Sequence, residues 1–349
     1  MLAAILQNDF DLSYQNWEEA CKKFNIDYNV IDLIKEDWSE KAQSRDYDIY
    51  LSCPPGREEI FKKLYDERIY ILDKILGKFV YPGFNEISLH ENKRYLSYWL
   101  RANKINHPRT YVFYRKEEAD VFAKSIELPV VGKMNIGASG KGVIIFKDRE
   151  ELLRYIHRAF STGIRQEWGP NLKMGDYRRR ILNIIKKPEI ISRKLTIYKK
   201  SFNELQKGFV VFQEYIEHDF EWRVVKIGNS FFGHQKVKQG DKASGTKGID
   251  YIAPPPELLD FVNNICVKYK FNSMAIDLFE DKKRGYLINE MQCIFGHVQP
   301  YICEKDGNPG RFLLKDGKWE FEEGMFNTNL SYDLRLQHVV QLHKKINSK

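Results

Sequence analysis

Short apolar runs alternate with amphipathic stretches near the start of the chain. The runs at 2–7, 28–34 and 48–52 have the length and composition of strands in a parallel sheet. Between the first two runs, apolar residues recur at the spacing of one helix face. This alternation predicts a βαβ layer at the N-terminus, which we delimit at residues 1–88.

The middle of the chain mixes helical and strand periods. Asp148 precedes a stretch with helical periodicity, where its side chain can cap the N-terminus of a helix at 149–160. The same patterns predict further elements on either side. Helices are expected at 91–102 and 117–124, and strands at 110–114, 194–198 and 209–212.

Hairpins dominate the pattern of the C-terminal part. Gly228 and Asn229 separate two strand-like runs, as a two-residue hairpin turn does. The expected elements are strands at 221–227, 230–234, 273–279 and 285–291, a polar loop at 236–248, helices at 257–269 and 332–346, and a hairpin about Asp316 and Gly317. Taken together, the elements predict an α/β chain whose later parts are of α+β type.

A glycine-rich loop stands at the tip of a predicted hairpin in LPVVGKMNIGASGKGVIIF, residues 128–146. The loop contains Gly137, Ala138, Ser139, Gly140, Lys141 and Gly142. Without bulky side chains, its successive N–H groups can close around phosphate oxygens, and Lys133 adds a positive charge nearby. No window has the spacing of a Walker A motif or of G-x-G-x-x-G. The loop is therefore either a lid over a nucleotide or an ordinary hairpin loop, and this stretch alone leaves both open.

Three oxygen-bearing side chains lie in the two strands 273–279 and 285–291. Strand alternation places Glu290 and Gln292 on one face, and Asp277 can lie opposite if the strands pair about the turn at 280–284. Such a cluster suits Mg²⁺, because hard cations prefer oxygen ligands. The alternative is that each buried carboxylate pairs with a lysine.

Composition excludes several classes of protein. With 349 residues, 43% hydrophobic and 30% charged, the chain is a globular protein with room for two or three cores. No apolar run approaches the roughly 18 residues of a membrane span, and the N-terminus lacks the basic region of a signal peptide. Five widely spaced cysteines without a C-x-x-C pair argue against disulfides or structural zinc. A cytoplasmic location without a membrane partner is expected.

The positive charge is local. Residues 165–200 hold eleven basic and three acidic residues, an excess equal to the net charge of +8 on the whole chain. The segment is either a surface for an anionic partner or a solvated or oligomer-forming helix. It alternates charges with aliphatic residues rather than aromatic ones, so nucleic-acid binding through base stacking has little support.

Between residues 91 and 296 the chain resembles the ATP-grasp enzymes, in particular the D-alanine–D-alanine ligases and the ribosomal-protein glutamate ligases. Six segments carry the resemblance in the family's order: ENKRYLSYWLRANKINHPRT, LPVVGKMNIGASGKGV, FQEYI, EWRVV, AIDLF and INEMQ. The resemblance implies an ATP-grasp fold with three units at 1–88, 89–215 and 216–349. It also implies ATP and Mg²⁺, or Mn²⁺ in its place, as cofactors.

The resemblance implies roles for individual residues. Lys93 and Lys133 would hold nucleotide phosphates under the loop 137–142. Adenine would be met by the segment of Gln213, Glu214, Tyr215 and Ile216, and the ribose hydroxyls by Glu221. The cations near the transferring phosphate would be Arg223 and either Lys236 or Lys238. The metal ligands would be Asp277, Glu290 and Gln292.

Two features depart from the family pattern. The last metal ligand is usually asparagine, and Gln292 sets its amide oxygen one methylene further out. The basic segment 165–200 is longer than the family's usual connection.

The reaction implied is ATP-driven joining of a small-molecule carboxylate to an amine or similar nucleophile, with one substrate anionic, through an acylphosphate and with release of ADP. Two alternatives remain: a kinase or phosphotransferase on the same fold, and a protein that binds nucleic acid or another anionic polymer. The sequence leaves homo-oligomerisation open.

Overall fold

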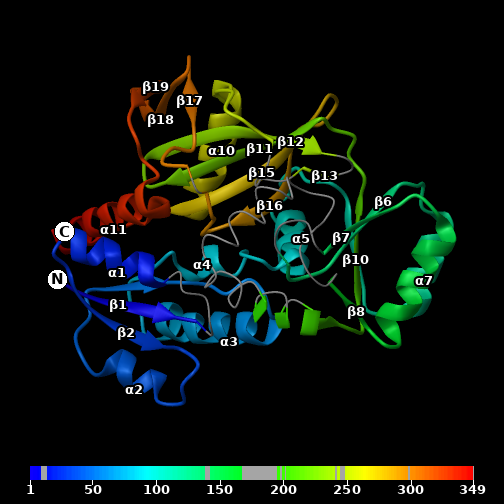
Figure 1. Cartoon of the computed structure of the whole chain (residues 1–349), viewed down its shortest axis with the longest axis horizontal. Coiled ribbons are helices and arrows are strands. Elements are labelled where there is room, and N and C mark those ends of the chain that lie inside the picture. The colour runs from blue at the N-terminus through cyan, green and yellow to red at the C-terminus, as the bar shows by residue number, and fades with distance from the viewer. Residues whose placement is uncertain are drawn as a thin grey trace.

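The computed structural model describes residues 1–8, 14–137, 142–166, 195–196, 199–200, 202–239, 242–243, 248–297 and 299–348. Three sheets of four or more strands follow one another along the chain, as the colour gradient of Figure 1 shows. No helix within these ranges is long and apolar enough to cross a membrane.

The first sheet is parallel, with strand order β2-β1-β3-β4. Its strands are β1 (Leu2–Gln7), β2 (Asp27–Asp32), β3 (Ile49–Ser52) and β4 (Val80–Tyr81). The nearby helices are α1 (Tyr14–Lys23), α2 (Trp38–Gln43), α3 (Glu59–Tyr70), a π-helical turn Ile71–Ile75, and α4 (Phe84–Ile87). The predicted βαβ layer is confirmed.

Strand alternation gives this sheet two apolar faces. Ile5 packs with Trp17 of α1 and with Leu336 of the last helix, α11 (Tyr332–Asn347), which lies beside α1 in Figure 1. Leu6 packs on the other face with Tyr65 of α3. The C-terminus of the chain therefore helps to cover the N-terminal sheet.

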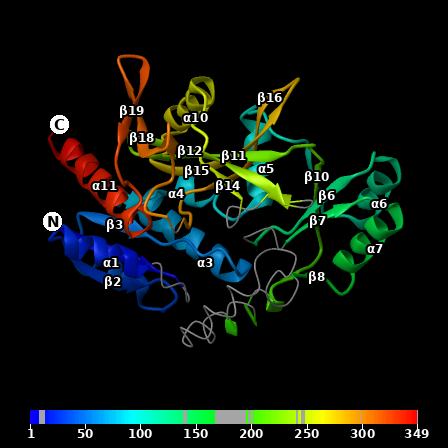
Figure 2. The ribbon, with the colours of Figure 1, turned by 45° about the horizontal axis from the view of Figure 1, so that its top comes forward.

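The second sheet is antiparallel, with strand order β5-β10-β6-β7. Its strands are β5 (Thr110–Phe113), β6 (Val130–Lys133), β7 (Val143–Phe146) and β10 (Val210–Glu214). Helices α6 (Lys116–Ser125) and α7 (Arg149–Phe160) share its core, and Figure 2 shows both on the outer side of the sheet. Asp148 caps α7 as predicted, because its Oδ1 accepts a hydrogen bond from the backbone N–H of Glu151.

Two further elements attach to this sheet. Helix α5 (Lys93–Ala102) precedes it and is capped by Asn92, whose side chain accepts from the backbone N–H of Tyr95. A two-stranded ribbon of β8 (Ile164–Arg165) and β9 (Leu205–Gln206) frames the start and end of the connection that carries the basic segment.

The third sheet has the strand order β16-β15-β11-β12-β18-β17, and in addition β13 and β14 pair with β12 and β19 pairs with β18. Its strands are β11 (Phe220–Ile227), β12 (Ser230–Gln239), β13 (Lys242–Ala243), β14 (Ile249–Asp250), β15 (Ser273–Asp281), β16 (Gly285–Gln292), β17 (Glu304–Lys305), β18 (Asn308–Lys315) and β19 (Lys318–Glu323). Helix α10 (Pro256–Tyr269) covers one face, where Val262 shares a core with Ile276 and Met291.

Two local predictions were wrong. Residues 195–196 are helical where the sequence predicted a strand at 194–198. Strand β12 continues through Gln239 into the expected polar loop, because β11, β13 and β14 pair with its backbone despite its polar composition. Most of the basic segment, residues 167–194, lies outside the described residues, and the unit boundaries at 88 and 215 stay predictions.

A buried carboxylate joins the first and third sheets. Glu86 in α4 accepts hydrogen bonds from the backbone N–H groups of Asn272 and Ser273, at 2.7 and 2.6 Å, and from that of Gly83 at 2.9 Å. Burial raises the pKa of Glu86 to about 7, although these three donors act in the opposite direction. The start of β15 is thus fixed to the N-terminal part of the chain.

We expect Glu86→Ala to lower the free energy of unfolding by about 3 kcal/mol or more, because it leaves buried N–H groups without an acceptor. Urea denaturation measures the change. Glu19→Ala, an exposed glutamate of α1, is the control and should change stability by less than about 0.5 kcal/mol. Equal effects of the two substitutions would contradict a joining role for Glu86.

Candidate active site

One cross-strand row of polar side chains crosses the third sheet on the face opposite α10. The register pairs His234 with Arg223, Arg223 with Asp277, and Asp277 with Glu290. Directly opposed residues of neighbouring strands share a face, so all four lie on the same side of the sheet. The predicted juxtaposition of Asp277 and Glu290 about the 281–285 turn is therefore present.

A β-bulge adds a further polar residue to this face. The register shifts between Asp277 and Leu278, which pair with Glu290 and Ile288, so Asn289 has no partner across the ladder. Its side chain nevertheless contacts Lys133 and Glu221, two residues of the polar cluster. Strict alternation would have placed Asn289 on the apolar face, and the sequence analysis missed it for this reason.

Asp277 is the centre of the cluster. Arg223 donates to both of its oxygens, Nε to Oδ1 at 2.7 Å and Nη2 to Oδ2 at 2.8 Å. Lys236 Nζ lies 2.7 Å from Asp277 Oδ2 and 2.6 Å from Glu221 Oε2. Burial alone would raise the pKa of Asp277, but Arg223 and Lys236 outweigh it and hold that pKa well below its usual range. The carboxylate is fixed in its ionised form.

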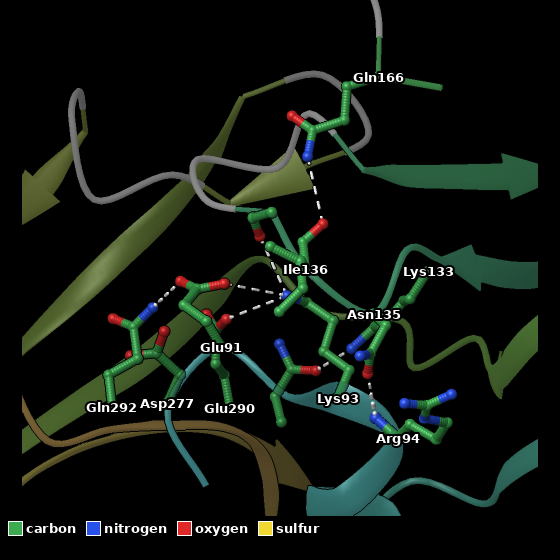
Figure 3. A network of polar contacts seen from close by, with 12 residues as sticks. Glu91, Lys93, Arg94, Lys133, Asn135, Ile136, Gln166, Asp277, Glu290 and Gln292 are labelled. Atoms are coloured by element: carbon green, nitrogen blue, oxygen red, sulfur yellow. Dashed lines mark hydrogen bonds and ion pairs between the residues drawn. The ribbon is translucent and has the colours of Figure 1, made fainter. Parts of the chain in front are cut away.

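Two lysines from the second sheet and α5 meet the acidic strands. Lys133, the last residue of β6, donates to Asn289 Oδ1 at 2.7 Å. Lys93, the first residue of α5, donates to the backbone oxygen of Gly137 at 3.0 Å and lies 3.7 Å from Glu290 Oε1 (Figure 3). The glycine loop and the acidic strands, far apart in the sequence, thus meet at one place.

The two lysines differ in pKa. Burial lowers the pKa of Lys133 to about 8, although Glu290 acts to raise it. Burial also acts to lower the pKa of Lys93, but Glu91 and Glu290 outweigh it and raise that pKa above its usual value.

Lys93 is positioned by contacts of the first turn of α5 with Asn135, the residue two positions after β6. Asn135, a buried residue just after β6, accepts from the backbone N–H of Arg94 through Oδ1 at 2.9 Å, and its backbone oxygen accepts from Lys93 N. Asn135 thereby satisfies donors in the first turn of α5 and ties the helix to the hairpin of β6 and β7. Asn135 and Glu91 both lie in segments that resemble the ATP-grasp enzymes, but the sequence analysis gave neither a role, because their contacts join distant parts of the chain.

The buried charges balance. Four cations, Arg223, Lys93, Lys133 and Lys236, stand against four carboxylates, Glu91, Glu221, Asp277 and Glu290. Within the part of the chain that the structure describes, no three His, Cys, Asp or Glu residues form a ready-made metal site. The lysines and Arg223 occupy the carboxylates instead, as the alternative reading expected for buried acids.

The residues present still fit Mg²⁺. Asp277, Glu290 and the amide of Gln292 offer oxygen atoms on one face of two paired strands. Burial raises the pKa of Glu290, a partly exposed carboxylate that lies 3.7 Å from Lys93 Nζ and opposite Asp277. A divalent cation would relieve that cost.

The predicted adenine segment lies at the far end of the cluster. The Glu214 carboxylate accepts two hydrogen bonds from Arg109: the backbone N–H donates to Oε1 at 2.9 Å and Nε donates to Oε2 at 2.8 Å. It also accepts a hydrogen bond from Arg284. Gln213 donates to Thr110 Oγ1 at 3.2 Å, and Tyr215 OH accepts from Lys238 Nζ at 3.0 Å. Lys238 is therefore bound at this end and Lys236 near Asp277.

A small apolar cluster adjoins this segment. It consists of Ile216, Phe279 and Leu287 and is separate from the main core. Phe279 and Leu287 face each other across β15 and β16. Such a patch beside the segment 213–216 suits one wall of a pocket for a flat, apolar ring.

The glycine loop is described only at its two ends. Gly137 has φ of +147°, and a Cβ there would lie 2.6 Å from Gln166 Nε2. Gly142 accepts from the backbone N–H of Met134 at 2.8 Å and so closes the hairpin. Ala138, Ser139 and Gly140 lie outside the described residues, so their predicted role stays a prediction.

No protein-family model matches the sequence, and a comparison with curated proteins finds no match. Solved structures do match. The D-alanine–D-alanine ligase of Bacillus anthracis has 15% identity and a TM-score of 0.54 over 100% of this chain and 99% of that one. A RimK-domain ATP-grasp protein of Sphaerobacter thermophilus has 16% identity and a TM-score of 0.53 over 83% of this chain and 90% of that one. A D-cycloserine synthetase has 12% identity and a TM-score of 0.54 over 97% of this chain and 100% of that one. The chain has the ATP-grasp fold, as the resemblance implied.

We expect the Lys133 amine to titrate near pH 8, more than two units below an exposed lysine, because it is buried among other cations. Glu290→Gln should lower this pKa further, since it removes the carboxylate that raises it. Lysine-selective NMR over a pH series measures both values, with Lys133→Met to assign the signal. Glu217→Gln, an exposed position, should leave the titration unchanged, and an unshifted Lys133 in Glu290→Gln would refute the coupling.

Proposed function

We propose that this chain is an ATP-dependent ligase that joins a carboxylate to an amine or similar nucleophile and forms ADP. One observation carries the proposal: Lys133 of the lid hairpin and Glu290 of the acidic strands belong to one buried polar cluster. A nucleotide triphosphate needs cations and a metal-binding carboxylate pair within one site. The names of the similar structures, a D-alanine–D-alanine ligase and a D-cycloserine synthetase, support ligase chemistry.

The nucleotide would lie along the polar face of the third sheet. Lys93 and Lys133 would hold its phosphates, with the loop 137–142 above them. The backbone of Tyr215 and Ile216 would meet adenine against Phe279 and Leu287, with Gln213 and Glu214 behind them. Glu221, now bound to Lys236 and Asn289, would accept the ribose hydroxyls.

Asp277, Glu290 and Gln292 would hold Mg²⁺, or Mn²⁺ in its place. When bound, the ion would neutralise negative charge on the phosphates. Arg223 and Lys236 are the ion-pair partners of the proposed ligand Asp277, so they stand where the transferring phosphoryl group would need positive charge. Lys238 would help from the adenine side.

The reaction would proceed in two steps. A substrate carboxylate oxygen attacks the γ-phosphorus, the bond to the bridging oxygen breaks, and ADP leaves with that electron pair. The nucleophile then bonds to the carbonyl carbon of the acylphosphate, the C–O bond to phosphate breaks, and the surplus proton of the nucleophile leaves with the phosphate. The lid would exclude water that hydrolyses the intermediate.

The five cysteines support a reducing compartment. Cys21, Cys53, Cys266, Cys293 and Cys303 are all buried, and none of these described residues forms a disulfide. Burial raises the pKa of Cys21, Cys266 and Cys303 to about 12, which keeps these thiols protonated and unreactive. We therefore propose a cytoplasmic enzyme with small-molecule substrates.

The proposal is tested by ADP release from Mg·ATP in the presence of a panel of carboxylic acids and amines. A ligase releases ADP in amounts that depend on both an acid and an amine, and an acylhydroxamate forms when hydroxylamine replaces the amine. ADP release that needs one acceptor only, with a stable phosphorylated product, would support the kinase alternative. No release with any pair, together with no binding of ADP, would contradict the proposal.

We expect Asp277→Asn and Glu290→Gln each to reduce turnover of Mg·ATP at least about a hundredfold, because each removes a negatively charged oxygen ligand of the proposed Mg²⁺. Coupled-enzyme detection of ADP measures the rate, and circular dichroism confirms that the variants are folded. Glu320→Gln, on the exposed strand β19, is the matched control and should keep the wild-type rate. A wild-type turnover rate in either site variant would show that the substituted residue is not a metal ligand.

A further inference from the structure

A hydrogen bond between two distant segments holds the amide of Gln292. Gln292 Nε2 donates to Glu91 Oε1 at 2.8 Å, across 201 residues of sequence (Figure 3). Gln292 is the last residue of β16, two positions beyond Glu290 on the same face. Glu91 lies just before α5 and opens the first segment that resembles the ATP-grasp enzymes, but the sequence assigned it no role.

This contact determines which way the amide faces. An ionised carboxylate only accepts hydrogen bonds, so the amide must present its NH₂ group to Glu91. The carbonyl oxygen of Gln292 then points away from Glu91, and no described residue donates a hydrogen bond to it. Oxygen is the atom that a hard divalent cation binds, whereas an NH₂ group carries no lone pair for it.

Glu91 is itself held firmly. It is 4% exposed and has φ of +48°, a left-handed conformation that a non-glycine residue adopts only where its surroundings impose it. A Cβ at Gly56 would lie 2.8 Å from Glu91 Cγ, so the turn after β3 packs directly on its side chain. Its second oxygen, Oε2, lies 3.4 Å from Lys93 Nζ.

We propose that Glu91 is a positioning residue, which orients the Gln292 amide so that its oxygen serves the Mg²⁺–nucleotide site. This inference rests on the proposed function. It accounts for the departure at position 292, because the extra methylene of glutamine lets the amide nitrogen reach Glu91 while the oxygen stays on the polar face. Oriented partners behind metal ligands commonly change metal affinity by one to two orders of magnitude.

The first test measures Mg²⁺ binding rather than activity. Full-length protein with saturating ADP is titrated with Mg²⁺ in a calorimeter, and Mn²⁺ with detection by electron paramagnetic resonance gives a second value. Glu91→Ala should weaken the apparent affinity about tenfold or more, because the amide of Gln292 can then rotate. Glu59→Ala is the matched control: it removes another partly buried carboxylate near α5, paired with Arg94, and should not change Mg²⁺ affinity.

A double-mutant cycle tests whether Glu91 acts through Gln292. In a Gln292→Ala background, Glu91→Ala should change Mg²⁺ affinity by less than about twofold, because the amide that it orients is gone. The same tenfold loss in both backgrounds would overturn the proposal. Thermal melting of each variant without ligand confirms that the compared proteins are folded.

A conservative variant of Glu91 distinguishes orientation of the Gln292 amide from an electrostatic effect of Glu91 on Lys93. Glu91→Gln keeps an oxygen that accepts from Gln292 Nε2 but removes the negative charge beside Lys93. Mg²⁺ affinity closer to wild type than to Glu91→Ala supports orientation of the amide. A loss as large as that of Glu91→Ala would mean that Glu91 acts on Lys93 and would refute the proposal. If the wild-type protein binds no ADP at any Mg²⁺ concentration, the proposed function fails first.

Discussion

The arrangement of the molecule depends on a balanced set of buried charges around Asp277. Removing a carboxylate from water is costly, and Asp277 is almost fully buried. Arg223 of β11 and Lys236 of β12 offset that cost with three short contacts. Because each member compensates another, the cluster fixes the relative positions of the strands that carry it and leaves little freedom for alternatives.

The same cluster joins parts of the chain that are separate in sequence. Lys133 comes from the second sheet, Lys93 from α5, and Glu290 from the third sheet, yet the three lie together. Glu86 makes an independent connection from the first sheet to β15. Under the proposed function, a site assembled at such a junction would respond to movement of the hairpin of β6 and β7, since a small shift of β6 would change the distance from Lys133 to the acidic strands.

The cluster places cations beside carboxylates on one face of the third sheet. Arg223 and Lys236 contact Asp277, and Lys93 lies near Glu290. Under the proposed function, an ion bound by the carboxylates would leave these cations in place for phosphate oxygens, so little reorganisation would be required. Such pre-arranged charge is the main means by which an active site stabilises phosphoryl transfer. The proposed role of Glu91 extends the principle, because the amide of Gln292 has no charge of its own to orient it.

The sequence alone determined most of the elements and the outline of the site. Periodicity predicted the parallel N-terminal layer, the capped helix after Asp148 and the hairpin that sets Asp277 opposite Glu290, because these depend on contacts between near neighbours. The segments that resemble ATP-grasp enzymes added Lys93 and Lys133 to the same site. A strand was wrongly predicted at residues 195–196, where apolar composition without a clear period does not separate strand from helix.

Only the tertiary structure decided which further residues join the site. Asn289 reaches the polar face because a bulge shifts the ladder between β15 and β16, and strict alternation along the strand does not predict that shift. Glu91 matters because folding brings it to Gln292, 201 residues away, and no periodicity describes such a contact. The packing of α11 on the first sheet is of the same kind. The local residue pattern determines whether a segment forms a helix or a strand. Contacts between segments that are distant in sequence depend instead on how all the elements pack around the core.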